Sequence, residues 1–384
     1  MSSRDDGHSN ERREASPPRV VVTYSIGARG TPDGHDASTR HELARRLARL
    51  AGYRYDGEYD PTRGYQVPSY FVPADTLTRA AAADLGIHDE RDLFGGVVPH
   101  PFAATKTITH PLAGTGAHAP LGWQPDFPRL VADVVLDGFA AFDHDDADKA
   151  GRELLVRGAV RLKRATGIAG HGQFVVENAV ELERALGVID SGEMASAGVV
   201  LEQNLADVVT YSVGRVRVAN AVAAYYGTQH TTTNNRGLEV YGGSKIVVVR
   251  GDFDALLALP LTAAVRLAIA QARAYDDAAM RCFAGFLASR RNYDVAQGTD
   301  ATGRTRSGVL EQSWRAGGAS GAEIAALEAF AGDPALRVVR AMTREVHGEP
   351  PMLPGNAAVY FSGVDPHVGL MTKYAWTEPY ADPR

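Results

Sequence analysis

The chain has 384 residues, which is too many for one ordinary core and enough for two or three domains. Its composition is globular, with 45% hydrophobic and 22% charged residues, and its net charge of −6 gives no indication of a nucleic-acid or anionic-membrane partner. The single cysteine, Cys282, excludes an intrachain disulfide, and no apolar run of about 18 residues is present to span a membrane.

The first elements in chain order predict an N-terminal α/β domain. Residues 1–18 are polar and lack the apolar stretch of a signal peptide, so we expect a disordered tail. "RVVVTYSIG" (19–27) predicts a buried strand, and "STRHELARRLARLAGY" (38–53) predicts an amphipathic helix with leucines at 43, 47 and 50 on one face. The glycines between them do not match the dinucleotide-binding fingerprint, which we therefore reject.

A lysine precedes a glycine loop in "AVRLKRATGIAGHGQFVV" (159–176). In a P-loop the lysine follows the glycines and opens a helix, whereas Lys163 ends a strand and the loop returns into a second strand. A lysine there can reach a phosphate as a point charge while the glycine backbone amides approach from above. The pattern predicts a hairpin lid, and Asn178 with Glu181 predicts a capped helix after it.

The C-terminal half reads as strands, one long helix and a strand pair. "GTQHTTTNNRG" (227–237) is very polar, and it either recognises substrate or is a solvated loop. "ASRRNYDVAQG" and "RSGVLEQSW" predict a hairpin that brings Asp294 opposite Glu311. Glu311, Ser313 and Arg315 alternate along the second strand and face one way. Two facing carboxylates repel unless a cation or proton joins them, and Mg²⁺ bridged by ATP phosphates is the usual resolution.

Together these motifs resemble the ATP-grasp superfamily over about residues 100–325, and more closely an uncharacterised bacterial family sometimes labelled biotin carboxylase-like. The residues that carry the resemblance are in "VRLKRATGIAGHGQFVVENAVELERAL", "GVVLEQNL" and "NYDVAQGTDATGRTRSGVLEQSWR". The nucleotide-binding residues that it implies are Lys106, Lys163, Gly167, Gly170, His171, Gly172, Glu202, Gln203, Leu205 and Asp207. The implied Mg²⁺ ligands, with Mn²⁺ as an alternative ion, are Asp294, Glu311 and Ser313. The implied catalytic residues are Arg315, which would orient a carboxylate, and Lys245, which would reach the γ-phosphate.

Two positions depart from the superfamily pattern, and a third departs from the biotin carboxylases. Ser313 stands where an asparagine usually follows the metal glutamate, and Thr210 stands where many relatives place an acid, for which Asp207 could substitute. Biotin carboxylases carry a glutamate four residues after the motif arginine, and this position is Ala319 here. The biotin carboxylase label is therefore unsupported.

The resemblance implies an α/β (α+β) ATP-grasp fold in which a Rossmann-like pre-ATP-grasp domain comes first. The expected domains are a tail (1–18), an N-terminal α/β domain (19–105), a central subdomain (106–203) with the lid at about 150–200, and a C-terminal subdomain (204–384) with the metal site. The implied function is an ATP- and Mg²⁺-dependent ligase that joins a carboxylate to an amine or other nucleophile through an acyl phosphate.

Two alternatives to a ligase stay open. One is a phosphotransferase on the same site, and the other is a nucleotide-binding protein without ligase activity, which the changes at Ser313 and Thr210 suggest. In each case we expect a cytoplasmic protein that acts on a small molecule or a peptide. We expect no nucleic-acid or membrane partner, and the superfamily resemblance is compatible with a homodimer.

Overall fold

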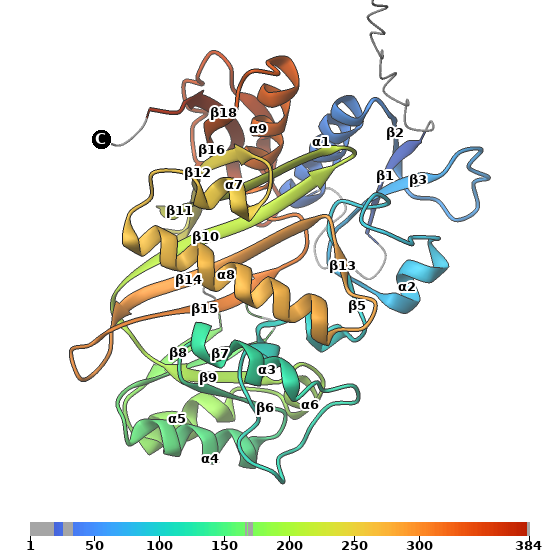
Figure 1. Ribbon diagram of the computed structural model, residues 1–384. Helices are drawn as coiled ribbons and strands as arrows, with labels where there is room; N and C mark the ends of the chain where they lie inside the picture. Colours follow the sequence, from blue (N-terminus) through green and yellow to red (C-terminus); the bar gives the residue numbers. More distant parts are fainter. Residues whose placement is uncertain (1–18, 26–33, 166, 168–171, 382–384) are drawn as a thin grey trace, which may run out of the picture.

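The computed structural model describes residues 19–25, 34–165, 167 and 172–381 of the chain. In this part of the chain the strands form four sheets, and helices cover the outer faces of the two largest (Figure 1). No helix in the described ranges is long and apolar enough to cross a membrane.

A three-stranded parallel sheet and one helix form the N-terminal unit. Its elements are β1 (Val20–Tyr24), α1 (His35–Ala51), β2 (Arg54–Glu58) and β3 (Ser69–Pro73), in the strand order β2-β1-β3. α1 buries Leu43 and Leu47, as the leucine spacing predicts, and begins three residues before the predicted helix. It ends at Gly52, whose φ of 72° is the left-handed conformation that glycine adopts readily.

Short elements connect this unit to the rest of the chain. They are β4 (Leu77–Thr78), α2 (Arg79–Asp84), β5 (Gly96–Val98), the 3₁₀ helices η1 (Pro101–Ala104), η2 (Lys106–Thr109) and η3 (Ala132–Val134), and α3 (Asp126–Val131). β5 pairs with β4 and also with β13 (Leu287–Ala288), so a small sheet joins segments that lie far apart in the sequence.

A four-stranded sheet carries the glycine hairpin. Its elements are β6 (Gly138–Ala141), α4 (His144–Leu155), β7 (Val160–Arg164), β8 (Gln173–Val176), α5 (Ala179–Gly187), α6 (Ser191–Ala197) and β9 (Val199–Gln203), with the strand order β6-β9-β7-β8. β7 and β8 form the predicted hairpin. The predicted cap of the next helix is also present, because the Asn178 side chain accepts from the Glu181 amide at 3.1 Å.

An antiparallel eight-stranded sheet forms most of the C-terminal half. Its strands are β10 (Ala206–Val218), β11 (Ala221–Thr233), β12 (Glu239–Arg250), β14 (Arg290–Thr299), β15 (Thr305–Ser313), β16 (Val338–His347), β17 (Ala358–Asp365) and β18 (Gly369–Pro379), in the order β15-β14-β10-β11-β12-β16-β18-β17. Its helices are α7 (Phe253–Leu257), α8 (Ala263–Cys282) and α9 (Ser320–Gly332). α8 packs against β10, β14 and β15, and α9 packs with α1 against strands at the other end of the sheet (Figure 1).

This arrangement is the predicted α/β (α+β) class. The four-stranded sheet with its glycine hairpin lies below the eight-stranded sheet, and the N-terminal α/β unit lies beside the eight-stranded sheet at the upper right (Figure 1). Each large sheet has its own buried cluster of apolar side chains, one under α4 and α5 and others under α8 and α9.

Candidate functional site

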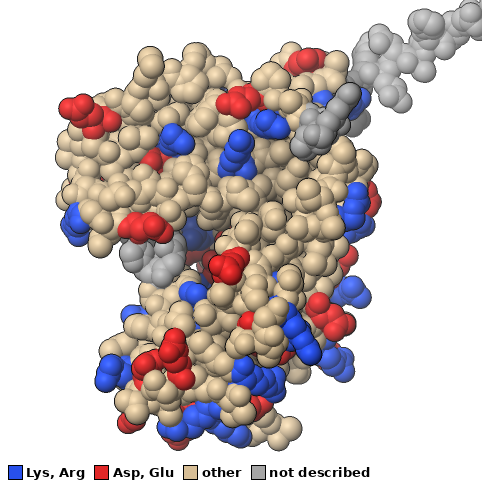
Figure 2. Space-filling view, turned by 90° about the vertical axis from the view of Figure 1, so that its left-hand side faces the viewer, with Lys and Arg blue, Asp and Glu red and all other residues tan. Residues whose placement is uncertain are grey.

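A cavity of about 1940 Å³ lies where the two large sheets and the N-terminal unit meet. Figure 2 shows the molecule narrowing between its upper and lower parts, with acidic and basic side chains near the narrowing. The volume exceeds the roughly 300–1,000 Å³ of most small-ligand pockets, so a nucleotide and a second molecule can fit together. The residues from the sequence-based site that line the cavity are Lys106, Lys163, Gly167, Glu202, Gln203, Leu205, Asp294, Glu311, Ser313 and Arg315.

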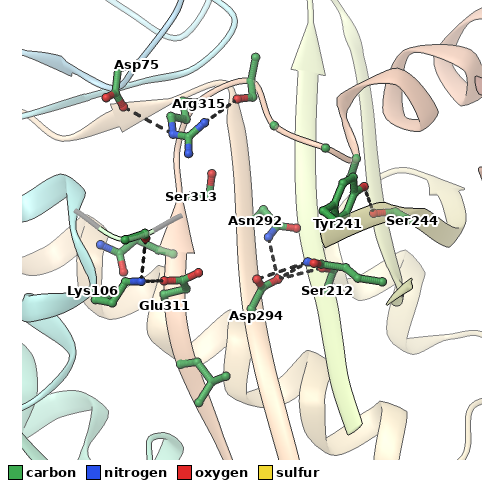
Figure 3. A pocket seen from close by; sticks show the side chains of 18 of the residues that line it. Asp75, Lys106, Ser212, Tyr241, Ser244, Asn292, Asp294, Glu311, Ser313 and Arg315 are labelled. Carbon is green, nitrogen blue, oxygen red and sulfur yellow. Dashed lines mark hydrogen bonds and ion pairs between the residues drawn. The ribbon is translucent and has the colours of Figure 1, made fainter. Parts of the chain in front are cut away.

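Lys106 connects the base of the glycine hairpin to the β14–β15 strand pair. η2 holds this side chain, which is only 5% exposed. Its ammonium lies 2.6 Å from the Glu311 carboxylate and donates to the Gly167 carbonyl at 3.2 Å (Figure 3). The ammonium therefore stands between the hairpin and an acid, where a phosphate can contact it.

Lys163 also lines the cavity and pairs with a buried acid. The Lys163 ammonium is 2.5 Å from one oxygen of Glu202, and the His110 ring nitrogen Nε2 is 3.2 Å from the other oxygen. Burial opposes ionisation of Glu202, but the charge of Lys163 and the His110 contact outweigh it and lower the pKa of this carboxyl to about 2. The Lys163 side chain is thus fixed by this ion pair beside strand β9.

Asp294 and Glu311 face each other across β14 and β15, in the register that the sequence predicts. The Asp294 carboxylate accepts hydrogen bonds from Ser212 at 2.8 Å, Asn292 at 3.1 Å and Gln229 at 3.2 Å (Figure 3). Burial and the neighbouring charge of Glu311 nevertheless raise the pKa of Asp294 above its usual value. The described residues thus give the Asp294 carboxylate neutral hydrogen-bond donors but no cationic partner.

These carboxylates fit a magnesium ion that is shared with phosphates. Among residues 19–25, 34–165, 167 and 172–381, no group of three or more His, Cys, Asp or Glu side chains could hold a metal ion. The protein offers Asp294, Glu311 and the Ser313 hydroxyl, and Mg²⁺ usually binds one or two carboxylates and completes its shell with water and substrate phosphates. The donor set suits Mg²⁺ bound with ATP and does not suit a separate metal centre.

Arg315 lies just beyond the end of β15 at the wall of the cavity. Its Nε is 3.5 Å from the Asp75 carboxylate, a long contact that leaves the guanidinium able to bind another anion (Figure 3). The loop that follows packs closely on the sheet, since a Cβ at Gly318 would lie 2.4 Å from the Tyr241 ring. Only glycine permits this approach.

The structure does not bring Lys245 to this site. On β12 its neighbour Ser244 lines the cavity, and successive strand residues point to opposite faces of a sheet. Lys245 is exposed and is not among the lining residues, so the expected contact with the γ-phosphate is not supported.

Other sequence-based residues lie at the edge of the site or outside the described residues. Asp207 is exposed at a bulge in β10, with a φ of 51°, and does not line the cavity. Gly172 accepts from the Arg164 amide at the base of the hairpin and is also outside the lining. Gly170 and His171 fall outside the described part of the chain.

Several residues at the site were not found from the sequence. Arg161 lines the cavity two residues before Lys163, and Asn292 lies two residues before Asp294, so strand alternation was a usable signal for both. His110, Ser212 and Gln229 reach the site only through pairing between distant segments, which a single sequence does not reveal.

Comparisons with known proteins give a family and several distant structural similarities. A family model described as "Protein of unknown function (DUF3182)" matches residues 23–375, whereas no curated protein matches the chain. Solved structures similar to the chain include D-alanyl-alanine synthetase A from Vibrio cholerae, with 11% identity, a TM-score of 0.49, and coverage of 77% of this chain and 88% of that chain.

Two further solved structures cover almost all of this chain. Biotin carboxylase from Campylobacter jejuni has 12% identity and a TM-score of 0.48, covering 96% of this chain and 88% of that chain. N5-carboxyaminoimidazole synthetase from Staphylococcus aureus has 12% identity and a TM-score of 0.43, covering 94% of each. Identities this low carry no information about substrate, so the chemistry rests on the residues of the cavity.

Proposed function

This chain belongs to the family described as a protein of unknown function, DUF3182, and we propose that it is an ATP- and Mg²⁺-dependent ligase. The observation that carries the proposal is that two buried lysines, a facing pair of carboxylates and an arginine line one cavity. Lys106 and Lys163 come from separate elements, η2 and β7, and both line this cavity, so both can contact one polyphosphate. Arg315 stands two residues after Ser313, just beyond the end of the strand that carries Glu311, where the acceptor group would bind.

The residues support the following chemistry. Mg²⁺ bound by Asp294 and Glu311 would neutralise charge on the β- and γ-phosphates. A substrate carboxylate, oriented by Arg315, attacks the γ-phosphorus, and the bond to the β,γ-bridging oxygen breaks so that ADP leaves. An amine or another nucleophile then attacks the acyl carbon, phosphate leaves, and the nucleophile releases its proton.

Nucleotide binding is tested by thermal shift with ATP, GTP and ADP, with and without Mg²⁺, on wild type and Lys163→Ala. A ligand that binds only the native state raises the melting temperature by mass action. We expect a Mg²⁺-dependent shift with ATP that Lys163→Ala loses. The absence of a shift with every nucleotide at millimolar concentration would remove the basis of the proposal.

The metal assignment is tested with Glu311→Gln, which keeps the shape of the side chain and removes its charge. We expect ATP turnover with carboxylate and amine pairs to fall by about 100-fold or more. The reason is that the charge developing on the phosphates loses an ion that stabilises it by several kcal/mol. Glu183→Gln, an exposed change on α5, serves as the control. Unchanged turnover in Glu311→Gln would show that this acid does not hold the ion.

The products distinguish the ligase from the two alternatives. A condensation product with ADP and phosphate supports the ligase, whereas a stable phosphorylated product supports a phosphotransferase. ATP binding without ADP release under every acceptor supports a binding protein. The last outcome would be explained by Ser313, whose single hydroxyl oxygen is a shorter ligand than an asparagine side chain.

A further inference from the structure

The cavity extends past Arg315 into a region that we name the distal chamber. It lies between the first turns of α1 and the ends of β16 and β18, and its lining includes Thr39, Arg40, Glu345, His347 and Lys373. The two sides are in contact, because the Lys373 ammonium on β18 is 3.4 Å from the Asp36 carboxylate of α1 and 3.1 Å from Glu345 on β16. The chamber is therefore a continuous polar surface.

Buried polar atoms without partners gather in the distal chamber. The Thr39 hydroxyl, the Arg40 Nε and both ring nitrogens of His347 are shielded from solvent and have no hydrogen-bond partner among the described residues. Most buried polar groups in proteins are paired, so each exception needs an explanation. The fact that all four atoms line one chamber points to a ligand that would pair them.

The charges of the chamber indicate which kind of ligand fits. The two acids, Asp36 and Glu345, already share Lys373. Arg40 has a hydrogen bond to the Ser25 hydroxyl and forms no ion pair in the described ranges, although the charges of Glu58 and Asp36 act on it from a longer distance. A part-buried guanidinium without an acid partner, next to other free donors, is suited to a carboxylate or a phosphate.

We propose that the distal chamber binds a second anionic group of the substrate, with Arg40 as its main contact. This inference rests on the proposed function, in which the reacting carboxylate of the substrate lies beside Arg315. The substrate would then carry a reactive carboxylate at one end and a carboxylate or phosphate at the other. Thr39 and His347 would complete the hydrogen bonds of the bound group.

Direct binding of simple anions tests the proposal without a reaction. Acetate, glutarate and inorganic phosphate are titrated calorimetrically into wild type, Arg40→Gln and the control Arg49→Gln. Arg49 lies on the same helix but is exposed and outside the cavity. We expect at least one anion to bind wild type, to bind Arg40→Gln about tenfold or more weakly, and to bind Arg49→Gln within about twofold of wild type. Preference for glutarate or for phosphate identifies the group.

Two further variants keep the test decisive. Thr39→Val removes one hydroxyl and no charge, and it should weaken the same anion if Arg40→Gln folds poorly. Lys163→Ala should lose the rise in melting temperature that ATP causes, and it should still bind the anion whose affinity depends on Arg40. If this anion binds but no nucleotide does, the proposed function is wrong and the distal chamber is still an anion site. The proposal of an anion site in the distal chamber is wrong if wild type binds no anion. It is also wrong if wild type, Arg40→Gln and Thr39→Val bind the anion with equal affinity.

Discussion

At the scale of single residues, the site keeps an acid that the surrounding protein does not fully stabilise. Three neutral donors surround the Asp294 carboxylate, yet burial and Glu311 still raise its pKa. Lys106 neutralises Glu311 and makes no ion pair with Asp294 in the described part of the chain. Functional sites commonly retain such unfavourable charges because the ligand needs them.

We therefore predict that Asp294→Asn makes the protein more stable and less active. When folding raises the pKa of a carboxyl, the group favours the folded state most at a pH below its pKa in the unfolded chain. This contribution to stability is lost as the pH rises through the pKa of the group in the folded protein. The variant should thus match wild type in stability below about pH 3.9 and be the more stable protein at pH 7, with no Mg²⁺-dependent ATP turnover. Urea unfolding at several pH values measures the difference.

Asp300→Asn provides the opposite case in the loop that follows the same strand. Asp300 accepts from Thr302, Arg304 and Arg306, and these hydrogen bonds lower its pKa. Its replacement should destabilise the protein at pH 7. If Asp294→Asn is also destabilising at pH 7, the repulsion between Asp294 and Glu311 is not a net cost in the folded state.

At the scale of elements, the hairpin between β11 and β12 forms a fixed wall of the cavity. The Asn235 amide donates to the carbonyls of Val368 at 2.7 Å and Leu370 at 3.0 Å, and Arg236 donates to the carbonyl of His367 at 2.9 Å. The hairpin tip is therefore attached to the turn between β17 and β18. The polar stretch 227–237 is mostly strand and turn, with its side chains divided between the cavity and the surface.

Asn235→Ala should loosen this wall without unfolding the sheet. Loss of two side-chain hydrogen bonds should cost about 1–2 kcal/mol locally. We expect faster amide hydrogen exchange in residues 234–238 and 367–370, with α8 unchanged. Asn356→Ala, which removes a bond to the Thr377 carbonyl elsewhere, is the control. Unaltered hydrogen exchange at the hairpin would show that the Asn235 hydrogen bonds do not hold it in place.

The strands of the large sheet differ in how well the sequence predicts them. The β14–β15 pair was predictable because turn residues and alternation act within 25 residues of chain. β17 and β18 were not, since prolines precede them in the chain and they form through pairing, β18 with β16 and β17 with β18. Lys245 shows the same limit, because the face of a strand depends on a register that the sequence alone leaves open.

At the scale of the whole molecule, one buried ion pair joins the site to the packing of the C-terminal half. Arg290 on β14 and Glu323 on α9 are 2% and 0% exposed, and their charged groups are 2.8 Å apart. The same guanidinium donates to the carbonyls of Ser313 at 3.1 Å and Arg315 at 2.8 Å. The loop that carries the proposed catalytic arginine is thus fixed by a residue outside the reaction.

A double-mutant cycle on this pair tests the connection. Arg290→Met and Glu323→Leu should each lower the free energy of unfolding by about 3–5 kcal/mol, because each leaves a buried charge without its partner. The double variant should lose clearly less than the sum, since no unpaired charge remains. Arg152→Met breaks an exposed pair with Asp148 and should change the free energy of unfolding very little.

Activity then separates stability from positioning. The double variant lacks the donor to the Ser313 and Arg315 carbonyls, so its ATP turnover should stay low even where its stability recovers. Glu323→Leu alone keeps this donor and should be the more active single variant at temperatures where both are folded. Additive losses in stability, or full activity in the double variant, would mean that the pair neither couples α9 to β14 nor holds Arg315 in place.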